Sequence, residues 1–202
     1  MTKAIVFDLG RVLIDFDFKL AVEGLKNRCP VDMLKLLTFF SHHSPAKDFD
    51  RGTLTEKDFF AAIQKEMDFP LSMEEFAGFW NGIFTEKEEM VRLAKSFKAR
   101  YKVGILSNTN PWHVRHLREK HGWVFEFDAF VGSCEVKLMK PDPEIYRLML
   151  RKLGVKPEEA FYTDDIEENV KAARKLGMDA VRFKDPGTFF EDVKKRGLLD
   201  KW

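Results

Sequence analysis

Short apolar runs in this sequence end on side chains that can do chemistry. The runs and the residues that close them are Ala4–Phe7 with Asp8, Val103–Leu106 with Ser107, and Ala160–Thr163 with Asp164 and Asp165. A carboxylate can attack a substrate as a nucleophile, and neighbouring carboxylates can bind a divalent cation. A hydroxyl just before a helix N-terminus can bind a phosphate group. These residue types therefore suggest covalent chemistry on an anionic substrate, assisted by a metal ion.

The apolar runs are predicted to be strands of one parallel sheet. Two further runs, Ala129–Val131 and Ala180–Phe183, fit the same template, and helical patterns separate all of them. Strands that are apolar on both faces and alternate with helices are typical of a parallel sheet covered on both sides. In such α/β sheets ligands bind beyond the carboxyl ends of the strands. We therefore expect Asp8, Ser107 and Asp164 to line one crevice.

Helix boundaries carry their own signals. Asn110-Pro111 and Asp142-Pro143 each predict an N-cap followed by proline at the first helical position, and Leu176-Gly177 predicts the end of a helix.

Residues 16–85 interrupt the alternation of strands and helices. Helix-like patterns rich in Phe and Met fill this stretch, without a convincing strand; they cover Phe18–Arg28, Val31–Phe40, Glu56–Met67 and Ser72–Phe84. A helical block placed after the first strand predicts a cap domain, whose Phe and Met side chains form its own core. We therefore expect a core domain at residues 1–15 and 86–202 and a helical cap domain at 16–85.

Composition excludes several classes of protein. Among 202 residues, 34 Lys and Arg nearly balance 33 Asp and Glu, so no overall field recruits nucleic acid or a membrane surface. Cys29 and Cys134 lack metal-binding spacing, and ordinary thiols are expected. With no apolar leader or run of membrane-spanning length, a soluble cytoplasmic protein is expected. The sequence specifies no oligomeric state.

Four stretches, in order along the chain, resemble a known family. They are FDLGRV at Phe7–Val12, VGILSNT at Val103–Thr109, KPDPEIY at Lys140–Tyr146 and FYTDDIEEN at Phe161–Asn169. They resemble the motifs of the haloacid dehalogenase (HAD) superfamily, in the branch with a C1-type helical cap. Together with DRGTLTEKDFF at Asp50–Phe60, they are especially similar to bacterial sugar phosphatases acting on alpha-D-glucose 1-phosphate. The resemblance covers nearly the whole chain and implies a Rossmann-like core.

The resemblance also implies roles for individual residues. Asp8 would be the nucleophile, and Lys140, which precedes Pro141 as in the third motif, would hold the phosphoryl group in preference to nearby Lys137. Phosphate would bind to Ser107 and to the amides of Asn108 and Thr109. Mg²⁺ would be held by the expected ligands Asp8, the Gly10 carbonyl, Asp165 and Asp164. Alternatively, Asp164 caps the following helix and only Asp165 binds the ion.

Residues that follow the acidic pair Asp164-Asp165 of the fourth motif are expected in a helix. Glu167 and Glu168 are expected in the first turn of a helix, where acidic side chains favour the macrodipole. Asn169 is either a support for the metal site or an ordinary polar helix residue.

Gly10 departs from the pattern of the superfamily. Most phosphatases of the superfamily have a second Asp at this position, which donates a proton to the leaving oxygen, whereas the glucose 1-phosphate phosphatases that the chain resembles also have glycine there. Such help contributes ~10²–10⁴ in rate. Glycine keeps only the backbone carbonyl. The stand-ins that the sequence offers are a metal-bound water, Asp15, Asp17, His42 and His43, although Asp17 equally fits the N-cap of a helix from Phe18.

These features lead to one main function and two alternatives. The main hypothesis is a Mg²⁺-dependent phosphatase of small phosphorylated metabolites, sugar phosphates such as glucose 1-phosphate among them, working through an aspartyl-phosphate. The alternatives are a metal-independent haloacid dehalogenase and a non-catalytic metabolite-binding protein. The pair Asp164-Asp165 argues against the dehalogenase, because metal-free attack on carbon gains nothing from extra carboxylates. Substrate choice is expected where the cap faces the crevice, and the candidate residues are Arg11, His42, His43, Arg51, Asn110 and Trp112.

Overall fold

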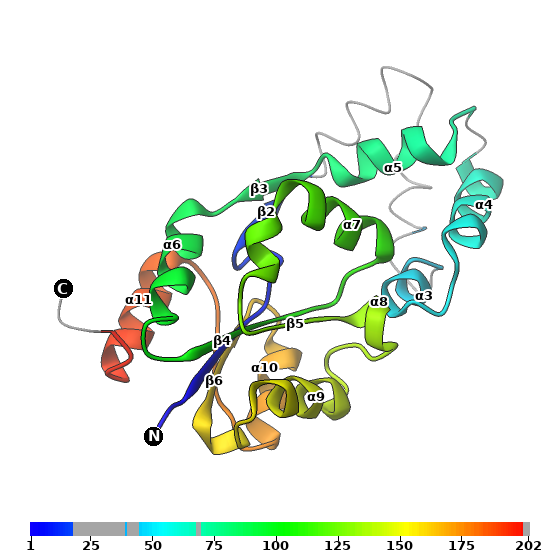
Figure 1. Cartoon of the computed structure of the whole chain (residues 1–202). Coiled ribbons are helices and arrows are strands. Elements are labelled where there is room, and N and C mark those ends of the chain that lie inside the picture. Colours follow the sequence, from blue (N-terminus) through cyan, green and yellow to red (C-terminus); the bar gives the residue numbers. More distant parts are fainter. Residues whose placement is uncertain (18–38, 40–44, 68–69, 200–202) are drawn as a thin grey trace.

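The centre of the molecule is a five-stranded parallel sheet. The computed structural model describes residues 1–17, 39, 45–67 and 70–199. Strand order is β5-β4-β1-β6-β7, and every neighbouring pair is parallel (Figure 1). The strands are β1 (Ala4–Phe7), β4 (Lys102–Ser107), β5 (Ala129–Gly132), β6 (Ala160–Asp164) and β7 (Asp179–Arg182). The predicted Rossmann-like α/β core is confirmed.

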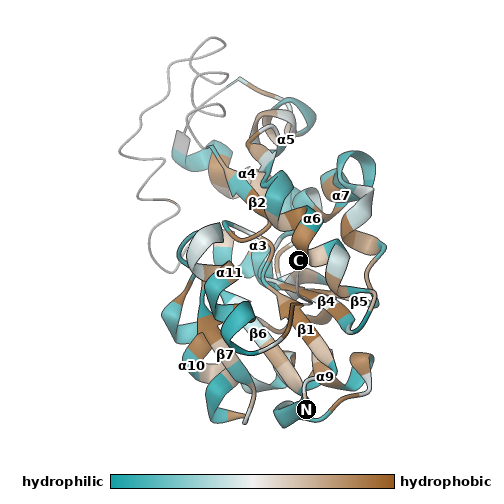
Figure 2. Ribbon diagram, turned by 90° about the vertical axis from the view of Figure 1, so that its left-hand side faces the viewer, coloured by the Kyte–Doolittle hydropathy of each residue, from teal (hydrophilic) through white to brown (hydrophobic). Residues whose placement is uncertain are grey.

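Helices cover both faces of this sheet, as the two-sided apolar strands predict. One apolar core joins β1, β4 and β6 to α6 (Glu88–Phe97), α7 (Pro111–Lys120) and α11 (Pro186–Lys195). A second core on the opposite face joins the same strands to α9 (Pro143–Leu153) and α10 (Glu167–Lys175). The outer faces of α10 and α11 are hydrophilic and the strands between the layers are apolar (Figure 2).

The predicted helix boundaries follow from local hydrogen bonds. Asn110 is the N-cap of α7, and its side chain accepts a hydrogen bond from the backbone N–H of His113. Asp142 caps α9 in the same way, with Pro143 as the first helical residue. Helix α10 ends at Leu176, and Gly177 follows with a left-handed φ of 94°. These three predictions are confirmed.

Register places the chemically active strand ends side by side. Phe7 on β1 pairs with Ile105 on β4 and with Thr163 on β6. The backbone N–H of Asp8 then donates to the carbonyl oxygen of Thr163 at 2.9 Å. Since Asp8 and Asp164 each follow one of these paired residues, their side chains leave the sheet at the same level.

The stretch between residues 14 and 86 differs in part from the prediction. Two short strands, β2 (Ile14–Phe16) and β3 (Phe84–Glu86), pair antiparallel at its two ends, although no strand was expected within 16–85. Strands of three residues are too short to show a period, and their pairing joins positions far apart in the chain. The pair marks where the chain leaves and re-enters the core (Figure 1).

Helices occupy the rest of that stretch where it is described. They are α3 (Pro45–Arg51), α4 (Glu56–Met67) and α5 (Met73–Asn81). Helix α4 matches its prediction, α5 ends before the predicted Phe84, and α3 was not predicted. A capping box at Ser72 and Glu75 sets the start of α5. The predicted helix Phe18–Arg28 lies outside the described residues, as does Val31–Phe40 apart from Phe39.

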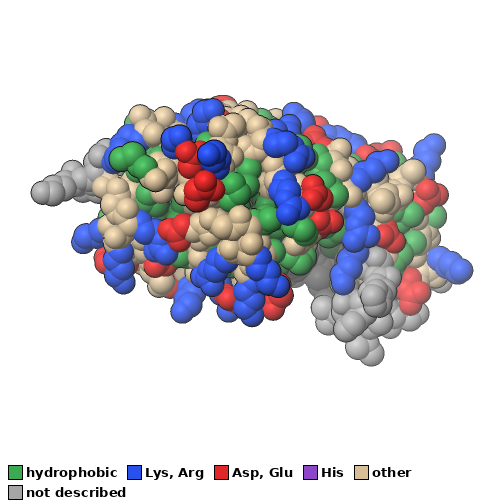
Figure 3. Space-filling model, turned by 90° about the horizontal axis from the view of Figure 1, so that it is seen from below, with side chains coloured by type: hydrophobic (Ala, Val, Ile, Leu, Met, Phe, Trp, Pro, Cys, Tyr) green, Lys and Arg blue, Asp and Glu red, His purple; other side chains and the backbone are tan. Residues whose placement is uncertain are grey.

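Short elements complete the chain: η1 (Gly122–Phe125), α8 (Ser133–Val136) and η2 (Pro157–Glu159). Among the described residues, no helix has the length and apolar character needed to cross a membrane. On the face shown in Figure 3, Lys and Arg side chains are interspersed with Asp and Glu.

Candidate active site

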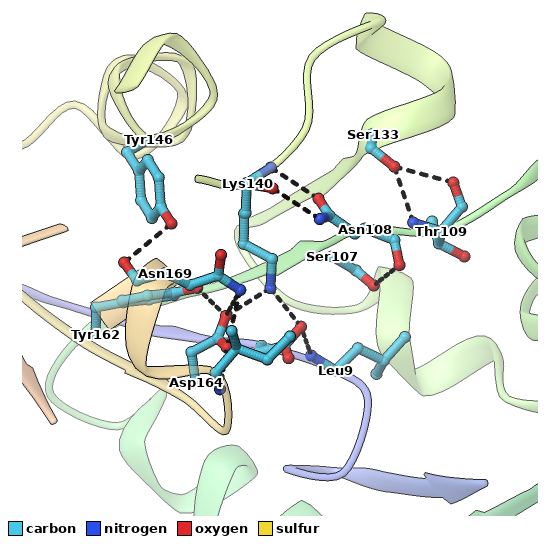
Figure 4. Close-up of polar contacts among 12 residues, drawn as sticks. Leu9, Ser107, Asn108, Thr109, Ser133, Lys140, Tyr146, Tyr162, Asp164 and Asn169 are labelled. Atoms are coloured by element: carbon cyan, nitrogen blue, oxygen red, sulfur yellow. Dashed lines mark hydrogen bonds and ion pairs between the residues drawn. The ribbon is translucent and has the colours of Figure 1, made fainter. Parts of the chain in front are cut away.

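A buried lysine connects two carboxylates at the carboxyl end of the sheet. Lys140 Nζ lies 2.7 Å from Asp8 Oδ1 and 2.7 Å from Asp164 Oδ2. All three side chains are buried, and Figure 4 shows Lys140 reaching toward Asp164. A buried ion pair is maintained only when each charge finds its partner in good geometry. Asp8, Asp164 and Lys140, together with Asp165, are called the acidic edge below.

The backbone of Lys140 is held by the loop after β4. The Lys140 N–H donates to Asn108 Oδ1 at 2.8 Å, and Asn108 Nδ2 donates to the Lys140 carbonyl oxygen at 3.0 Å. This reciprocal pair fixes the lysine relative to the sheet (Figure 4). Asn108 was expected to bind phosphate through its amide; its side chain has the different task of positioning Lys140.

Asp164 is surrounded by donors. Its carboxylate accepts hydrogen bonds from Tyr162 Oη, from Asn169 Nδ2 at 3.0 and 3.1 Å, and from the backbone N–H of Ile166 at 2.8 Å. Tyr146 Oη in turn donates to the Asn169 carbonyl oxygen at 3.0 Å. Both oxygens of Asp164 therefore have partners. Asn169 holds the Asp164 carboxylate, and the bond from Ile166 is a local turn; the N-cap of α10 is Ile166, so Asp164 is not the helix cap that the sequence allowed.

The pKa values of Asp8 and Lys140 reflect an excess of carboxylates over cations in the acidic edge. Burial raises the pKa of Asp8 to about 7; the carboxylates of Asp164 and Asp165 act in the same direction, and Lys140 opposes them. Burial works to lower the pKa of Lys140, but the two carboxylates outweigh it and raise that pKa. The amine therefore stays charged, while Asp8 needs a further cation to be fully ionised at neutral pH.

A divalent cation fits this arrangement. Ligand oxygens of Asp8, Asp164 and Asp165 all lie within 4.8 Å of one another. Three carboxylates facing one ammonium leave two negative charges uncompensated when all are ionised. Mg²⁺ supplies that charge and prefers carboxylate oxygens together with water. Asp165, half-buried and not bound to Lys140, is the acid best able to offer an oxygen.

Arg11 stands at the rim of the acidic edge. It has a left-handed backbone with φ of 57°, and its exposed guanidinium lies 4.0 Å from Asp165 Oδ2. At this distance and exposure the attraction is weak. The contact of Arg11 with an anionic substrate stays a prediction.

The loop after β4 is held by the end of the neighbouring strand. Ser107 is buried, and its hydroxyl makes a long contact of 3.5 Å with the Asn108 carbonyl oxygen. The Thr109 N–H donates to Ser133 Oγ at 2.8 Å instead of being free for a phosphate. Ser133, the first residue of α8, thus holds this amide, and the phosphate role expected of the amide stays a prediction.

Asn110 and Trp112 face the helical stretch. Asn110 Nδ2 donates to Asp50 Oδ1 at 3.1 Å and to His113 Nδ1 at 3.1 Å. Burial lowers the pKa of His113 to about 3, so its ring is neutral and Nδ1 can accept. Trp112 Nε1 donates to Glu56 Oε2 at 2.8 Å, and Glu56 also pairs with Arg115.

Trp112 belongs to the apolar cluster of the helical stretch although it lies on α7. Its ring centroid lies 5.0 Å from that of Phe49 and 5.4 Å from that of Phe59, and its ring also packs against Phe76. Ser133 Oγ donates to the Asp50 carbonyl oxygen across the same boundary. These contacts between α3–α5 and α7–α8 are called the junction below.

Other predicted candidates lie away from the acidic edge. Asp15 pairs with Lys87 at 2.9 Å, Arg51 lies 3.7 Å from Asp48, and Lys137 is exposed. Asp17 is exposed, and Glu167 and Glu168 lie in the first turn of α10, as expected. The half-buried thiol of Cys134 is free, and burial raises its pKa to about 12. His42, His43 and Cys29 lie outside the described residues.

Several supporting residues were missed by the sequence reasoning. Ser133 closes β5 as Ser107 closes β4, so the pattern of polar residues at strand ends could have found it. Tyr162 lies two positions before Asp164 on the same strand, and side chains at that spacing share a face. Tyr146 and Asp50 lie in the stretches KPDPEIY and DRGTLTEKDFF, but no role could be assigned to them because their partners come from other elements.

Comparisons with known proteins show the family of this chain. A model of the haloacid dehalogenase-like hydrolases matches residues 2–177. D-ribitol-5-phosphate phosphatase of Bacteroides thetaiotaomicron is 27% identical over 89% of this chain and 90% of its own length. Fructose-1-phosphate phosphatase of Escherichia coli is 30% identical over 46% of this chain and 49% of its own.

A solved structure shares both fold and sequence with this chain. It is a HAD family enzyme of Bacteroides thetaiotaomicron in complex with magnesium and inorganic phosphate, with a TM-score of 0.82 and 26% identity. The similarity covers 94% of this chain and 100% of that one. With the family model spanning most of its 202 residues, the chain belongs to the haloacid dehalogenase-like hydrolases.

Proposed function

We propose that this protein is a Mg²⁺-dependent phosphatase that hydrolyses small phosphorylated metabolites, with sugar phosphates such as glucose 1-phosphate as the substrate class. The observation that carries the proposal is the acidic edge, where one buried lysine contacts Asp8 and Asp164 at 2.7 Å beside Asp165. A nucleophilic carboxylate, a fixed cation and a further acid are thereby close enough to act on one phosphoryl group.

Asp8 performs the covalent step. Its carboxylate oxygen attacks phosphorus, a bond forms between that oxygen and phosphorus, and the bond from phosphorus to the leaving oxygen breaks. The leaving oxygen takes a proton and departs as an alcohol. Water then attacks phosphorus, the bond to Asp8 breaks, and inorganic phosphate leaves with the carboxylate restored. Splitting the hydrolysis in this way replaces one difficult displacement by two easier ones.

The other residues reduce the repulsion between two anions. Lys140 holds a positive charge against Asp8 in a buried site, where such a charge acts strongly on the transition state. Asp8, Asp165 and Asp164 would hold Mg²⁺, with the Gly10 carbonyl as a further ligand, and the ion would neutralise charge on the phosphoryl oxygens. The Ser107 hydroxyl, the Asn108 amide and Arg11 are the remaining groups that would contact the phosphate.

We also propose that residues 16–85 act as a cap over this site, with 1–15 and 86–202 as the core. The support is that α3–α5 lie between β2 and β3 and meet the core at the junction, next to the loop that carries Ser107. Thr109 and Asn110 would then link substrate binding to cap position rather than touch the substrate themselves.

The test is a screen of phosphorylated metabolites with and without Mg²⁺, measuring inorganic phosphate. Asp8→Asn keeps the shape of the side chain but removes the nucleophile, so it supplies the background. We expect phosphate release that needs Mg²⁺, is lost in EDTA and is absent in Asp8→Asn. Equal release by Asp8→Asn and the unmodified protein would refute the proposal.

The dehalogenase alternative predicts a different result. Attack on carbon without a metal gains nothing from the carboxylates of Asp164 and Asp165 beside Asp8, since their charges oppose its ionisation. Halide release from a 2-haloacid in EDTA would favour that alternative. Tight metabolite binding without turnover in excess Mg²⁺ would favour a non-catalytic protein.

A further inference from the structure

Gly10 is surrounded in a way that explains why it has no side chain. A Cβ atom at this position would lie 2.5 Å from Cζ and 2.6 Å from Cε2 of Phe16. Carbon atoms in proteins do not approach so closely, so any larger residue requires the Phe16 ring to move. The space beside Gly10 is therefore already filled by an aromatic ring.

Backbone conformation does not impose this glycine. The left-handed glycines of the described chain are Gly52, Gly154, Gly177 and Gly197, and Gly10 is not one of them. Gly52 is the useful contrast, because its φ is 72° and a Cβ there would lie 2.1 Å from the carbonyl oxygen of Cys134. No side-chain change could relieve that contact. At Gly10 the obstacle is the end of one side chain, and a second substitution can remove it.

The turn after Asp8 brings Phe16 back over Gly10. The Ile14 N–H donates to the Leu9 carbonyl oxygen at 3.0 Å, and the Arg11 N–H donates to the Ile14 carbonyl oxygen at 2.6 Å. With Arg11 left-handed, the chain reverses and enters β2. There Phe16 pairs with Phe84 of β3, and the two rings meet edge to face with centroids 5.4 Å apart.

The same side of the nucleophile carries no buried acid among the described residues of the turn. Asp15 is exposed and paired with Lys87 at 2.9 Å, and Asp17 is exposed. Arg11 is permanently charged and cannot give up its proton. What lies beside Gly10 is aromatic carbon, which has no proton to donate.

We propose that Phe16 determines substrate class, because its ring takes the space of a proton-donating side chain at position 10. This proposal rests on the phosphatase function proposed above. The leaving oxygen then departs without an acid from that position, so the enzyme acts on esters whose leaving oxygen is a weak base. Among metabolites this describes phosphate on an anomeric carbon, where the ring oxygen withdraws electrons, rather than phosphate on a primary alcohol.

The first experiment measures dependence on the leaving group in excess Mg²⁺. The protein is assayed with p-nitrophenyl phosphate and phenyl phosphate, and with the isomers glucose 1-phosphate and glucose 6-phosphate. We expect kcat/KM to be at least ~10²-fold higher for p-nitrophenyl phosphate than for phenyl phosphate, and for glucose 1-phosphate than for glucose 6-phosphate. This factor is the lower end of what a positioned acid contributes. Equal kcat/KM within both pairs would overturn the inference and leave the phosphatase function standing. No hydrolysis of any of the four would instead refute the phosphatase function.

The second experiment tests the packing independently of activity. Gly10→Ala adds only the blocking Cβ and should lower Tm by roughly 2–10 °C, as overpacking does in a protein of this size. In a Phe16→Ala background, or Phe16→Leu if the former folds poorly, Gly10→Ala should lower Tm by less than half of its effect in the unmodified protein. Phe84→Ala is the matched control, since it removes the neighbouring ring and leaves Phe16 in place. The inference is overturned if Gly10→Ala has the same effect on Tm in all three backgrounds.

Discussion

The acidic edge and the junction both use buried or half-buried carboxylates, but they stabilise them by different means. At the acidic edge Asp8 and Asp164 share one lysine, and the Tyr162 hydroxyl that bonds to Asp164 belongs to a ring of the apolar core under the sheet. At the junction Asp50 and Glu56 lie around the rings that pack on Trp112. In the first region the charged side chains contact one another directly above the apolar core, whereas in the second region they lie around an aromatic cluster that includes Trp112.

This difference matters for function. Groups at the acidic edge are poorly balanced, as the raised pKa of Asp8 indicates, and such imbalance is what a site awaiting a cation and a phosphate needs. At the junction burial also raises the pKa of Asp50, to about 6, but its carboxylate accepts a hydrogen bond from Asn110 beside the packed rings, which suits a scaffold. Four substitutions would break or sharpen the contrast, and they follow from the largest expected effect to the smallest.

Lys140→Met should have the largest effect. It leaves Asp8 and Asp164 buried without their cation, which should lower the free energy of unfolding by ~3–5 kcal/mol. Loss of a fixed charge at the reacting group should also reduce kcat by at least ~10²-fold. Urea unfolding and phosphate release measure the two effects. Lys137→Met, on an exposed lysine of the same loop, is the control and should stay within ~0.5 kcal/mol.

Trp112→Ala should destabilise the protein by ~3–5 kcal/mol, because it empties the centre of an aromatic cluster. Its effect on kcat should be much smaller than that of Lys140→Met, since Trp112 contacts no residue of the acidic edge. Trp112→Phe keeps a ring and loses the bond to Glu56, so its cost should be near ~1 kcal/mol. A loss of kcat as large as that of Lys140→Met would show that the two regions are not separable.

Asp50→Asn should stabilise the protein in a pH-dependent way. Burial raises the pKa of Asp50 from 3.8 to about 6, partly opposed by the bond from Asn110. Below pH 4 the carboxyl is protonated in both folded and unfolded chains; between pH 4 and 6 the unfolded chain ionises first, and folding loses stability. The advantage of the Asn variant should therefore grow by roughly 1–3 kcal/mol from pH 4 to 7 and then stay constant. Thermal unfolding of both proteins across this range provides the measurement, and a difference independent of pH would contradict the assignment.

Glu56→Gln should have the smallest effect, at most ~1 kcal/mol. It removes the charge that faces Arg115, whose side chain is 57% exposed, while the amide oxygen can still accept from Trp112. Added salt should weaken the original pair and shrink the difference between the two proteins. Unfolding in urea at low and high salt tests this, and a larger loss that persists in salt would mean that charge does matter at the junction.

Much of this site could be predicted because its residues follow local patterns. Asp8 and Asp164 close apolar runs, and Asn110 and Asp142 stand before prolines, so strand ends and helix starts are visible over a few residues. The strands β2 and β3 escaped prediction because each has three residues and gains its partner from the other end of the helical stretch. The contact between Thr109 and Ser133 also could not be predicted, since the two residues are 24 positions apart.

The amino-acid sequence by itself determined the order of the five core strands, the core composition and which carboxylates stand at strand ends, because those depend on periodicity and on near neighbours. Tertiary structure alone decided that Lys140 joins Asp8 to Asp164, that Trp112 packs into the helical stretch, and that Phe16 fills the space beside Gly10. Each of these depends on how far a side chain reaches once distant segments are packed together. Packing density makes such contacts specific, and no local pattern records them.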